Sequence, residues 1–422
     1  MDKKKGSIWH RYKVWARAVH IHSLITAIFL MTFLTAFAQE SGKKFSFYGQ
    51  VRNDFYYQNR QAQESSEGFV MLFPLDKVYD ETGKDINRAS SANLFNFHTS
   101  LGVNITGPTF GKVSTSGTVE IDFRGSLNGS GGILRLRNAV MRFRWGNWWL
   151  SMGQLGHDLG HSLYNETVSL NVGAPYQPTG RVPQIKIQYN DPAKYLVAFS
   201  LLWQAQGGSI GPNGRSREYL RNSGVPEMSL KAEIHNTEGS LLGTVIHFAS
   251  IRPRLQSDEG YKVDERVSAF NLQLYGRYRK GLFTVAGKTM LNQNFTQSNT
   301  LGGYGVTSKD VRTGEQQYAP LRIWQSWVNV LYGRKWRGGF FGGYIKNFGA
   351  SEPVSGLIGT GTNIDQMFTV SAMLNYNIPH WRFGFEYSLT EAFYGTNDAY
   401  GKVRNTHGIV NHRPYATVVF MF

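Results

Sequence analysis

The sequence contains no cysteine among its 422 residues, and only 13 of them are proline. Without cysteine there can be no disulfide, no thiolate metal ligand and no cysteine nucleophile. Beyond the N-terminal region, no segment comes near the run of about 18 apolar residues that a membrane-spanning helix needs. These absences exclude a disulfide-stabilised secreted domain and a bundle of membrane-spanning helices.

The N-terminal region has the features of a secretory signal peptide. Six Lys and Arg residues lie between positions 3 and 17, and an apolar stretch follows from Leu24 to Phe37. Ala36, Phe37 and Ala38 form the small-x-small pattern of a cleavage site. We therefore expect a signal peptide at 1–38 and a single further domain at 39–422. The apolar stretch is short for the alternative, an uncleaved membrane anchor.

Acidic residues are fewer than basic ones, 29 against 45, so the formal net charge is +16. The expected signal peptide holds six of the basic and one of the acidic residues. The mature chain keeps 39 and 28, a net charge of +11. Such an excess suits nucleic acid or an anionic surface or solute. Because an exported chain rarely meets nucleic acid, we expect no nucleic-acid partner and favour anionic solutes or the membrane surface.

What the chain has instead is alternation of apolar and polar residues at a period of two. In the run 113–124, apolar residues such as Ile121 and Phe123 alternate with charged ones such as Glu120 and Asp122. A β-strand directs successive side chains to opposite faces, so this segment has an apolar face and a charged face. The charged face is too polar for the dry core of a soluble barrel, which leaves the apolar face for lipid.

About sixteen such runs follow one another, the last from about Pro414, with short turns such as Gly107-Pro108 at one end. Long polar segments at the other end cover roughly 59–93, 126–132, 156–181, 206–225, 253–265, 293–319, 349–362 and 391–409. This arrangement is typical of outer-membrane barrels. The predicted fold class is all-β, a transmembrane antiparallel β-barrel of about 16 strands with short periplasmic turns and long extracellular loops.

One run breaks the alternation. Arg135 and Arg137 share a face, whereas Arg142 and Arg144 lie on the opposite face of a regular strand. A β-bulge near 138–139 would turn all four side chains inward. We favour the bulge, because an arginine on the lipid face costs about 2–4 kcal/mol at the midplane.

Several segments together resemble the trimeric porins of Gram-negative bacteria, and more closely their DcaP-like branch of sixteen-stranded porins. The resemblance rests on the segments 47–52, 134–139, 152–154, 180–186 and 225–227, and on an amphipathic last strand that ends in Phe422. The terminal Phe422 resembles the signal that outer-membrane proteins present to their barrel assembly machinery. The C-terminal half matches only in its periodicity and its ending.

The resemblance implies a homotrimer in the cell outer membrane, in contact with lipids and lipopolysaccharide, that passes small and often anionic solutes such as carboxylates. It also implies that residues 156–180, called the constriction loop below, fold into the lumen and narrow it. His157, Asp158 and His161 lie in this loop.

The candidate functional residues are the charged side chains that the alternation turns inward, because rings of charge set ion selectivity in a pore. An alternative is that they form ion-pair networks that stiffen the wall. The pore-lining candidates are Arg52, Arg124, Arg135, Arg137, Arg142, Arg144, Arg181, Lys186, Glu120 and Asp122.

Two other kinds of site are open to consideration and are not favoured. His157, Asp158 and His161 could ligate a metal if they were helical, but the flanking glycines argue against a fixed helix. His98 and Ser100 share a face, as a catalytic pair would, yet they stand about 7 Å apart along a strand and point inward. We therefore expect no catalytic residues, no metal and no cofactor.

The sequence predicts a porin through which small hydrophilic, and in particular anionic, solutes diffuse passively. The alternative is a barrel that is not a channel: an adhesin, a scaffold of an outer-membrane complex or a lipid-modifying enzyme. Neither the solute nor the openness of the lumen follows from composition.

Overall fold

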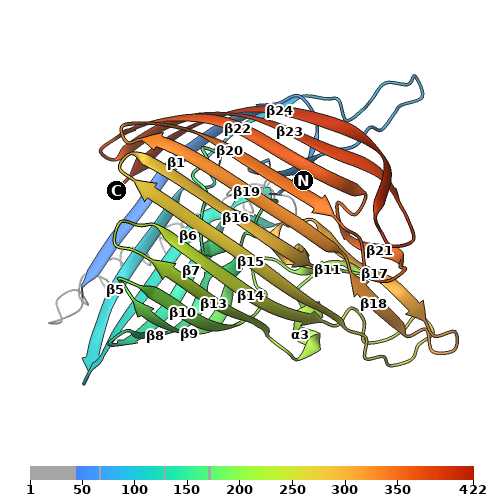
Figure 1. Cartoon of the computed structure of the whole chain (residues 1–422), viewed down its shortest axis with the longest axis horizontal. Helices are drawn as coiled ribbons and strands as arrows, with labels where there is room; N and C mark the ends of the chain where they lie inside the picture. The colour runs from blue at the N-terminus through green and yellow to red at the C-terminus, as the bar shows by residue number, and fades with distance from the viewer. Residues whose placement is uncertain (1–43, 66–67, 128–129, 170–172) are drawn as a thin grey trace, which may run out of the picture.

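The computed structural model describes residues 44–422 except 66–67, 128–129 and 170–172. The expected signal peptide at 1–38 lies outside the described residues. Most of the described chain is β-strand, arranged as one closed antiparallel barrel (Figure 1).

The barrel has sixteen strand positions, which confirms the predicted fold class and strand number. The sheet contains seventeen segments, and two of them, β4 and β5, occupy a single position beside β1. The segments are β1 (Phe45–Gln58), β4 (Ser91–Phe95), β5 (Ser100–Phe110), β6 (Val113–Leu127), β7 (Ser130–Trp145), β8 (Trp148–Gly156), β9 (Arg181–Asp191), β10 (Tyr195–Leu202), β13 (Glu227–His235), β14 (Leu241–Ile251), β15 (Val267–Lys280), β16 (Phe283–Gln293), β19 (Arg322–Gly333), β20 (Trp336–Asn347), β22 (Ile364–Ile378), β23 (Trp381–Asn397) and β24 (Val403–Met421).

The first and last strands close the barrel by pairing with each other. Their register runs from Gln50 opposite Met421 to Tyr56 opposite Tyr415. The amides of Gly49 and Phe422 exchange hydrogen bonds of 3.0 and 3.1 Å. A Cβ atom on Gly49 would lie 2.7 Å from the ring of Phe422, so glycine makes room for the terminal side chain. Closure satisfies the strand backbone internally, as a membrane interior requires.

The strands bury polar side chains and expose apolar ones, the reverse of a soluble protein. On β15, Asn271 and Gln273 face inward with 1% and 0% of their surface exposed. Their neighbours Phe270 and Leu272 face outward and are 62% and 48% exposed. Because side chains alternate along a strand, the outward face of β15 is apolar and suits lipid.

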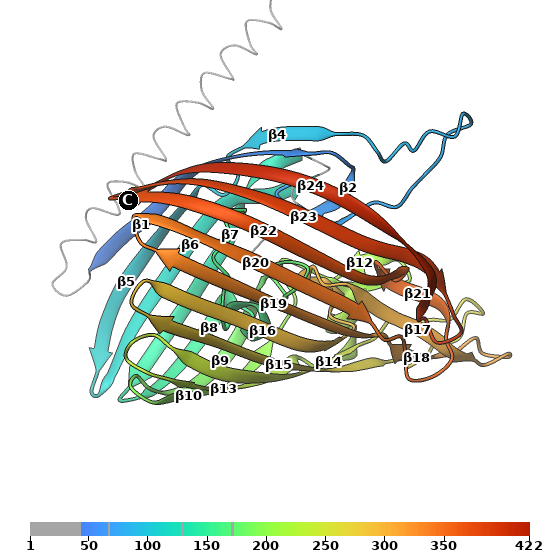
Figure 2. The same ribbon diagram turned by 45° about the horizontal axis from the view of Figure 1, so that its top comes forward.

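The two ends of the barrel differ, as Figures 1 and 2 show. Tight turns join the strands at the end that holds the C-terminus. The loops at the other end carry two short helices, α2 (Asp158–His161) and α3 (Glu218–Ser223), the 3-10 turn η1 (Thr296–Ser298), and the strands β2 (Ala62–Ser65), β3 (Val70–Pro74), β11 (Ser209–Gly211), β12 (Gly214–Ser216), β17 (Gly302–Lys309), β18 (Gln316–Pro320) and β21 (Ser355–Thr360). In the described ranges, no helix has the length and apolar character to cross a membrane.

Three boundaries predicted from the alternation are wrong. The chain does not turn at Gly107-Pro108; β5 continues past a register shift there and turns at 111–112. The segment 391–409 is not a long loop, because β23 and β24 extend to a connection at 398–402. Likewise β6 and β7 occupy most of 126–132. The last two boundaries lie on the loop side, where both faces can be polar, so alternation gives no signal there.

Candidate functional site

A β-bulge on β7 turns four arginines toward the lumen. Across from it on β6, Glu120 pairs with Asn138 and the next residue, Ile121, pairs with Leu136, so Arg137 is the extra residue. The predicted bulge is therefore confirmed, one residue before its expected place. Because the phase changes at this point, Arg135 and the arginines that follow the bulge share the inner face.

Two of these arginines bind carboxylates on the neighbouring strand. Arg135 donates to both oxygens of Asp122, at 2.9 and 2.6 Å. Arg137 lies 3.0 Å from Glu120 and 3.6 Å from Asp122. The bidentate contact with Asp122 holds the guanidinium plane of Arg135 in a fixed orientation. The acids on β6 therefore position these two arginines and neutralise part of their charge.

The inner faces of β6, β7 and β9, called the arginine wall below, border a cavity of about 760 Å³. Five arginines line it, and none of its described lining residues carries a carboxylate. A second cavity of about 400 Å³ lies among the loops and shares Ser65, Arg215 and Asn299 with the first. The lining arginines are Arg124, Arg135, Arg137, Arg181 and Arg215.

Three of the five have no carboxylate within ion-pair distance among the described residues: Arg124, Arg181 and Arg215. Arg124 stacks on the ring of Phe69, 4.2 Å from its centroid, and its buried Nε atom has no hydrogen-bond partner in the described chain. Arg215 donates to the carbonyl oxygens of Gly208 and Thr296 at 2.9 and 2.7 Å. The cavity therefore carries uncompensated positive charge.

The other predicted pore-lining residues lie elsewhere in the barrel. Arg142 donates to Thr118 Oγ1 at 2.8 Å and does not line the cavity. Arg144 is exposed near the short turns, against the ring of Trp149. Arg52 forms a buried pair with Asp54 at 2.8 Å, and also donates to the constriction loop at Val168 O. Lys186 binds Asp158 of the same loop.

The constriction loop crosses the lumen to the inner faces of β19, β20, β22 and β23, called the loop-bearing wall below. Glu166 accepts two hydrogen bonds from Arg337, at 2.9 and 3.0 Å. Trp327 donates to Gln177 at 2.9 Å. These contacts link residues about 150 to 170 positions apart, and they place the loop inside the barrel as the resemblance implied.

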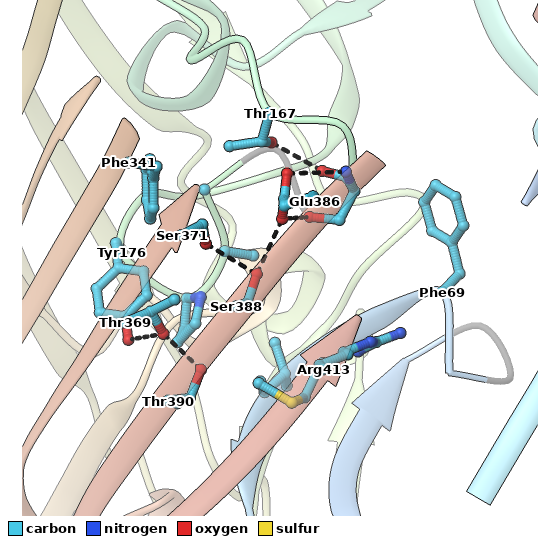
Figure 3. A pocket seen from close by; sticks show the side chains of 16 residues that line it. Phe69, Thr167, Tyr176, Phe341, Thr369, Ser371, Glu386, Ser388, Thr390 and Arg413 are labelled. Atoms are coloured by element: carbon cyan, nitrogen blue, oxygen red, sulfur yellow. Dashed lines mark hydrogen bonds between the residues drawn. The ribbon is translucent and has the colours of Figure 1, made fainter. Parts of the chain in front are cut away.

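Glu386 on β23 is the central acceptor of the loop-bearing wall (Figure 3). Its carboxylate accepts hydrogen bonds from the backbone amides of Val168 and Ser169, at 2.7 and 3.2 Å, and from the hydroxyl of Ser169. Ser388 donates to the same carboxylate at 3.0 Å. Glu386 is 1% exposed, so its charge is committed to the loop and not to solute.

At the start of the loop, α2 is fixed by Asp158. Ser200 and Ser229 donate to one of its oxygens, at 2.8 and 2.6 Å, and Lys186 binds the other. Burial by itself would raise the pKa of Asp158. The charge of Lys186 and the hydrogen bonds outweigh burial and hold this pKa below its ordinary value. The carboxylate is therefore ionised at neutral pH.

Next to it, His157 and His247 share the carboxylate of Glu227, with Nε2 to Oε2 distances of 3.4 and 3.2 Å. All three are at most 1% exposed. The ligand atoms lie within 4.8 Å of one another, close enough for one metal ion.

The hydrogen bonds of the two imidazoles argue against a metal. A metal-bound histidine carries its proton on the other ring nitrogen and donates it to an acceptor. Here each Nδ1 atom faces a donor: the backbone N–H of Leu159 at 3.2 Å for His157, and the amide nitrogen of Asn271 at 3.1 Å for His247. Asn271 is oriented by its oxygen, which accepts the N–H of Gln293. The cluster is therefore a hydrogen-bonded carboxylate.

The structure separates the loop residues that the sequence grouped. His157 and Asp158 are buried against the wall, whereas His161 lines the arginine cavity beside Tyr164. Burial, together with the charge of Arg181, holds the pKa of His161 well below its ordinary value, so it is neutral. His98 also lines this cavity, 3.2 Å from Arg137.

Sequence reasoning missed Phe69, Arg215 and His247. The first two lie in loops, where no periodicity indicates which side chains point inward. His247 follows the inward phase of β14 and could have been found from it.

Comparisons with known proteins identify the fold. No family model matches the sequence, and no curated protein matches it. Among solved structures, the outer membrane channel DcaP of Acinetobacter baumannii superposes with a TM-score of 0.67 at 16% identity, over 91% of this chain and 99% of that one. The chain has the fold of an outer-membrane porin. The trimer form of OmpT of Vibrio cholerae gives 0.52 at 11% identity, over 90% and 99% of the two chains. The anion-selective porin of Comamonas acidovorans gives 0.53 at 8%, over 90% and 100%.

Within this porin fold, the arginine cavity and the constriction loop are two features of the described lumen. Arg124, Arg181 and Arg215 offer guanidinium donors without an acidic partner in the described chain, whereas Arg135 and Arg137 are bound to Asp122 and Glu120.

Proposed function

We propose that this chain, after removal of a signal peptide at 1–38, forms a homotrimeric porin of the outer membrane through which small hydrophilic solutes diffuse passively, with preference for anions. One observation carries the proposal: a cavity of about 760 Å³ in the lumen is lined by five arginines and by no carboxylate of the described chain. Excess fixed positive charge in a narrow lumen raises the local concentration of anions.

The unpaired donors support the anion preference further. Arg124 presents a buried Nε–H without a partner, and an anionic group in the cavity would satisfy it. Guanidinium groups bind carboxylate and phosphate oxygens in a two-point geometry. Two of the similar structures are a channel and an anion-selective porin, which agrees with this function for the fold.

The arrangement does not suit the lipid-modifying enzyme considered above. His98 lies in the lumen, 3.2 Å from Arg137, and not on the lipid-facing surface where such an enzyme would need it. We therefore propose no catalytic role for His98 and Ser100.

Planar-bilayer recording of the purified protein tests the proposal. Unitary current steps are expected, with a reversal potential in a KCl gradient that indicates chloride preference. A potassium preference would contradict the anion selectivity. Absence of steps would contradict the channel and favour a barrel plugged by its constriction loop.

A further inference from the structure

Glu227 joins three loop-side segments to the barrel wall. Its oxygen Oε1 accepts from Gln204, which follows β10, at 2.8 Å, and from Gln297 of η1 at 3.1 Å. Its oxygen Oε2 accepts from His157 of the constriction loop and from His247 of β14. These five side chains are called the Glu227 clasp below.

Each basic atom of Glu227, His157 and His247 already accepts a hydrogen bond. Both oxygens of Glu227 accept two, as an ionised carboxylate can. The Nδ1 atom of His157 accepts the N–H of Leu159, which caps α2, and the Nδ1 atom of His247 accepts from Asn271. An added proton on any of these atoms would face a donor, so proton uptake must break at least one buried hydrogen bond.

From this geometry we propose that the Glu227 clasp is an acid-sensitive anchor of the constriction loop. In the closed clasp both imidazoles are neutral, since each Nδ1 atom accepts a hydrogen bond. As pH falls, protonation of His157 breaks the cap of α2, and protonation of His247 breaks its bond with Asn271. The start of the loop is then released from the wall, and it moves within the lumen.

The other charged groups near the clasp make their own contacts, so the proton is expected to bind to the clasp itself. On α2, Asp158 is already paired with Lys186 of β9. From β16, the ammonium group of Lys288 donates to the carbonyl oxygens of Leu159 and Gly160, at 3.0 and 3.2 Å. His161 and Arg181 face the arginine cavity. Lys288 and Arg181 have no acidic partner in the described chain, whereas the negative charge of Glu227 contacts both imidazoles and favours their protonation.

The effect on solute passage rests on the proposed function, whereas release of the loop does not, so the two are measured separately. Because the chain lacks cysteine, a single introduced thiol reports on the loop without background. Leu159 is fully buried beside the clasp, and Tyr164 in the same loop is 42% exposed. L159C is therefore the reporter and Y164C its control for the ordinary pH dependence of thiol reactivity.

We expect the rate of maleimide labelling of L159C, divided by that of Y164C, to rise about tenfold between about pH 7.5 and about pH 5, the change expected when one buried hydrogen bond is lost. In the background H157N/H247Q the ratio is expected to stay level, because asparagine still caps a helix and neither side chain titrates. H98Q, which changes a histidine of the arginine cavity, is expected to keep the full response.

E227Q provides the opposite variant, because its amide nitrogen faces donors at every pH. Its labelling ratio is expected to be high already at pH 7.5 and to change little in acid. A level ratio in the parent, or an undiminished response in H157N/H247Q, would overturn the proposal. Stoichiometric Zn²⁺ binding that E227Q abolishes would overturn it as well, since it would make these residues metal ligands.

Bilayer recordings then connect the anchor to passage. Current fluctuations are expected to increase in acid in the parent and not in H157N/H247Q. A parent that shows the labelling response but no current steps would overturn the channel function and leave the anchor standing. Current steps without a labelling response would overturn the anchor and leave the channel function standing.

Discussion

The arginine wall and the loop-bearing wall face each other across one lumen, yet they use their charges differently. On the arginine wall, Arg124 and Arg181 have no acidic partner in the described chain and border open space. On the loop-bearing wall, Glu386 is buried under the backbone of the constriction loop. Charge in the lumen therefore has two roles: where it has no carboxylate or loop partner it is available to solute, and where it binds the loop it is structural.

The comparison also explains why inward charge alone does not define a selectivity residue. Arg52 and Lys186 point inward, but both are bound to carboxylates and to the loop. A buried pair of this kind contributes little net field, and loss of one partner is costly. The residues that act on solute are expected to be the inward charges without a partner.

The largest expected effect concerns the bulge that creates the arginine wall. Deletion of Arg137 removes the extra residue and leaves every other pair with β6 unchanged, so the barrel is expected to assemble. Deletion of Phe143, in the regular part of β7, would make Arg142 and Arg144 neighbours on opposite faces, so that one of them faces lipid, at a cost that reaches about 2–4 kcal/mol at the midplane. Heat-modifiable mobility on gels measures the folded fraction. Equal folding of the two deletion variants would show that the bulge does not set the phase.

Charge reversal on the arginine wall is the next largest effect. R124E/R181E replaces two unpaired cations in the cavity with anions, and the reversal potential in a KCl gradient is expected to change from chloride to potassium preference. K280E/K335E makes the same change in net charge at the short turns, outside the cavity, and is expected to keep chloride preference. If both variants shift alike, total charge and not the cavity determines selectivity.

The sequence was sufficient to predict the barrel, its strand number and the bulge, because each of them determines where apolar and polar residues alternate. The arginines at 135, 137, 142 and 144 share one face only if the strand contains one extra residue between the two pairs. A β-bulge supplies this extra residue. Alternation failed where strands leave the lipid, as at 391–409, because polar residues there occupy both faces.

The sequence was not sufficient to tell solute-facing charges from structural ones. That distinction depends on which inward residues the constriction loop covers, and the loop's path is set by contacts between distant positions such as Val168 and Glu386. Arg215 reaches the cavity from a loop between β10 and β13, and no local pattern marks it. Pairing across the lumen is a property of the closed fold.

The third effect tests how Asp158 holds the loop. Its folded-state pKa lies below the unfolded value of about 3.9, so the stability it contributes is present above that pH and is lost as pH falls through the folded pKa. D158N leaves Lys186 without its partner, which is expected to destabilise the protein by about 3–5 kcal/mol at pH 7. The difference in urea midpoint between parent and D158N is expected to shrink below about pH 4. D258N, in an exposed pair, serves as the control; a pH-independent difference for D158N would contradict the ion pair.

The smallest effect is expected when glutamine replaces either of two glutamates, Glu386 and Glu166, that join the constriction loop to the loop-bearing wall. E386Q turns an amide toward the N–H groups of Val168 and Ser169, and is expected to cost about 1–3 kcal/mol, since buried donors lose an acceptor. Glu166 is half exposed in its pair with Arg337, so E166Q is expected to cost less than about 1 kcal/mol, and less still in 1 M salt. Urea unfolding at low and high salt measures both. A larger loss for E166Q would mean that the loop is held at its exposed end, and that the buried carboxylate on the loop-bearing wall is not the main anchor.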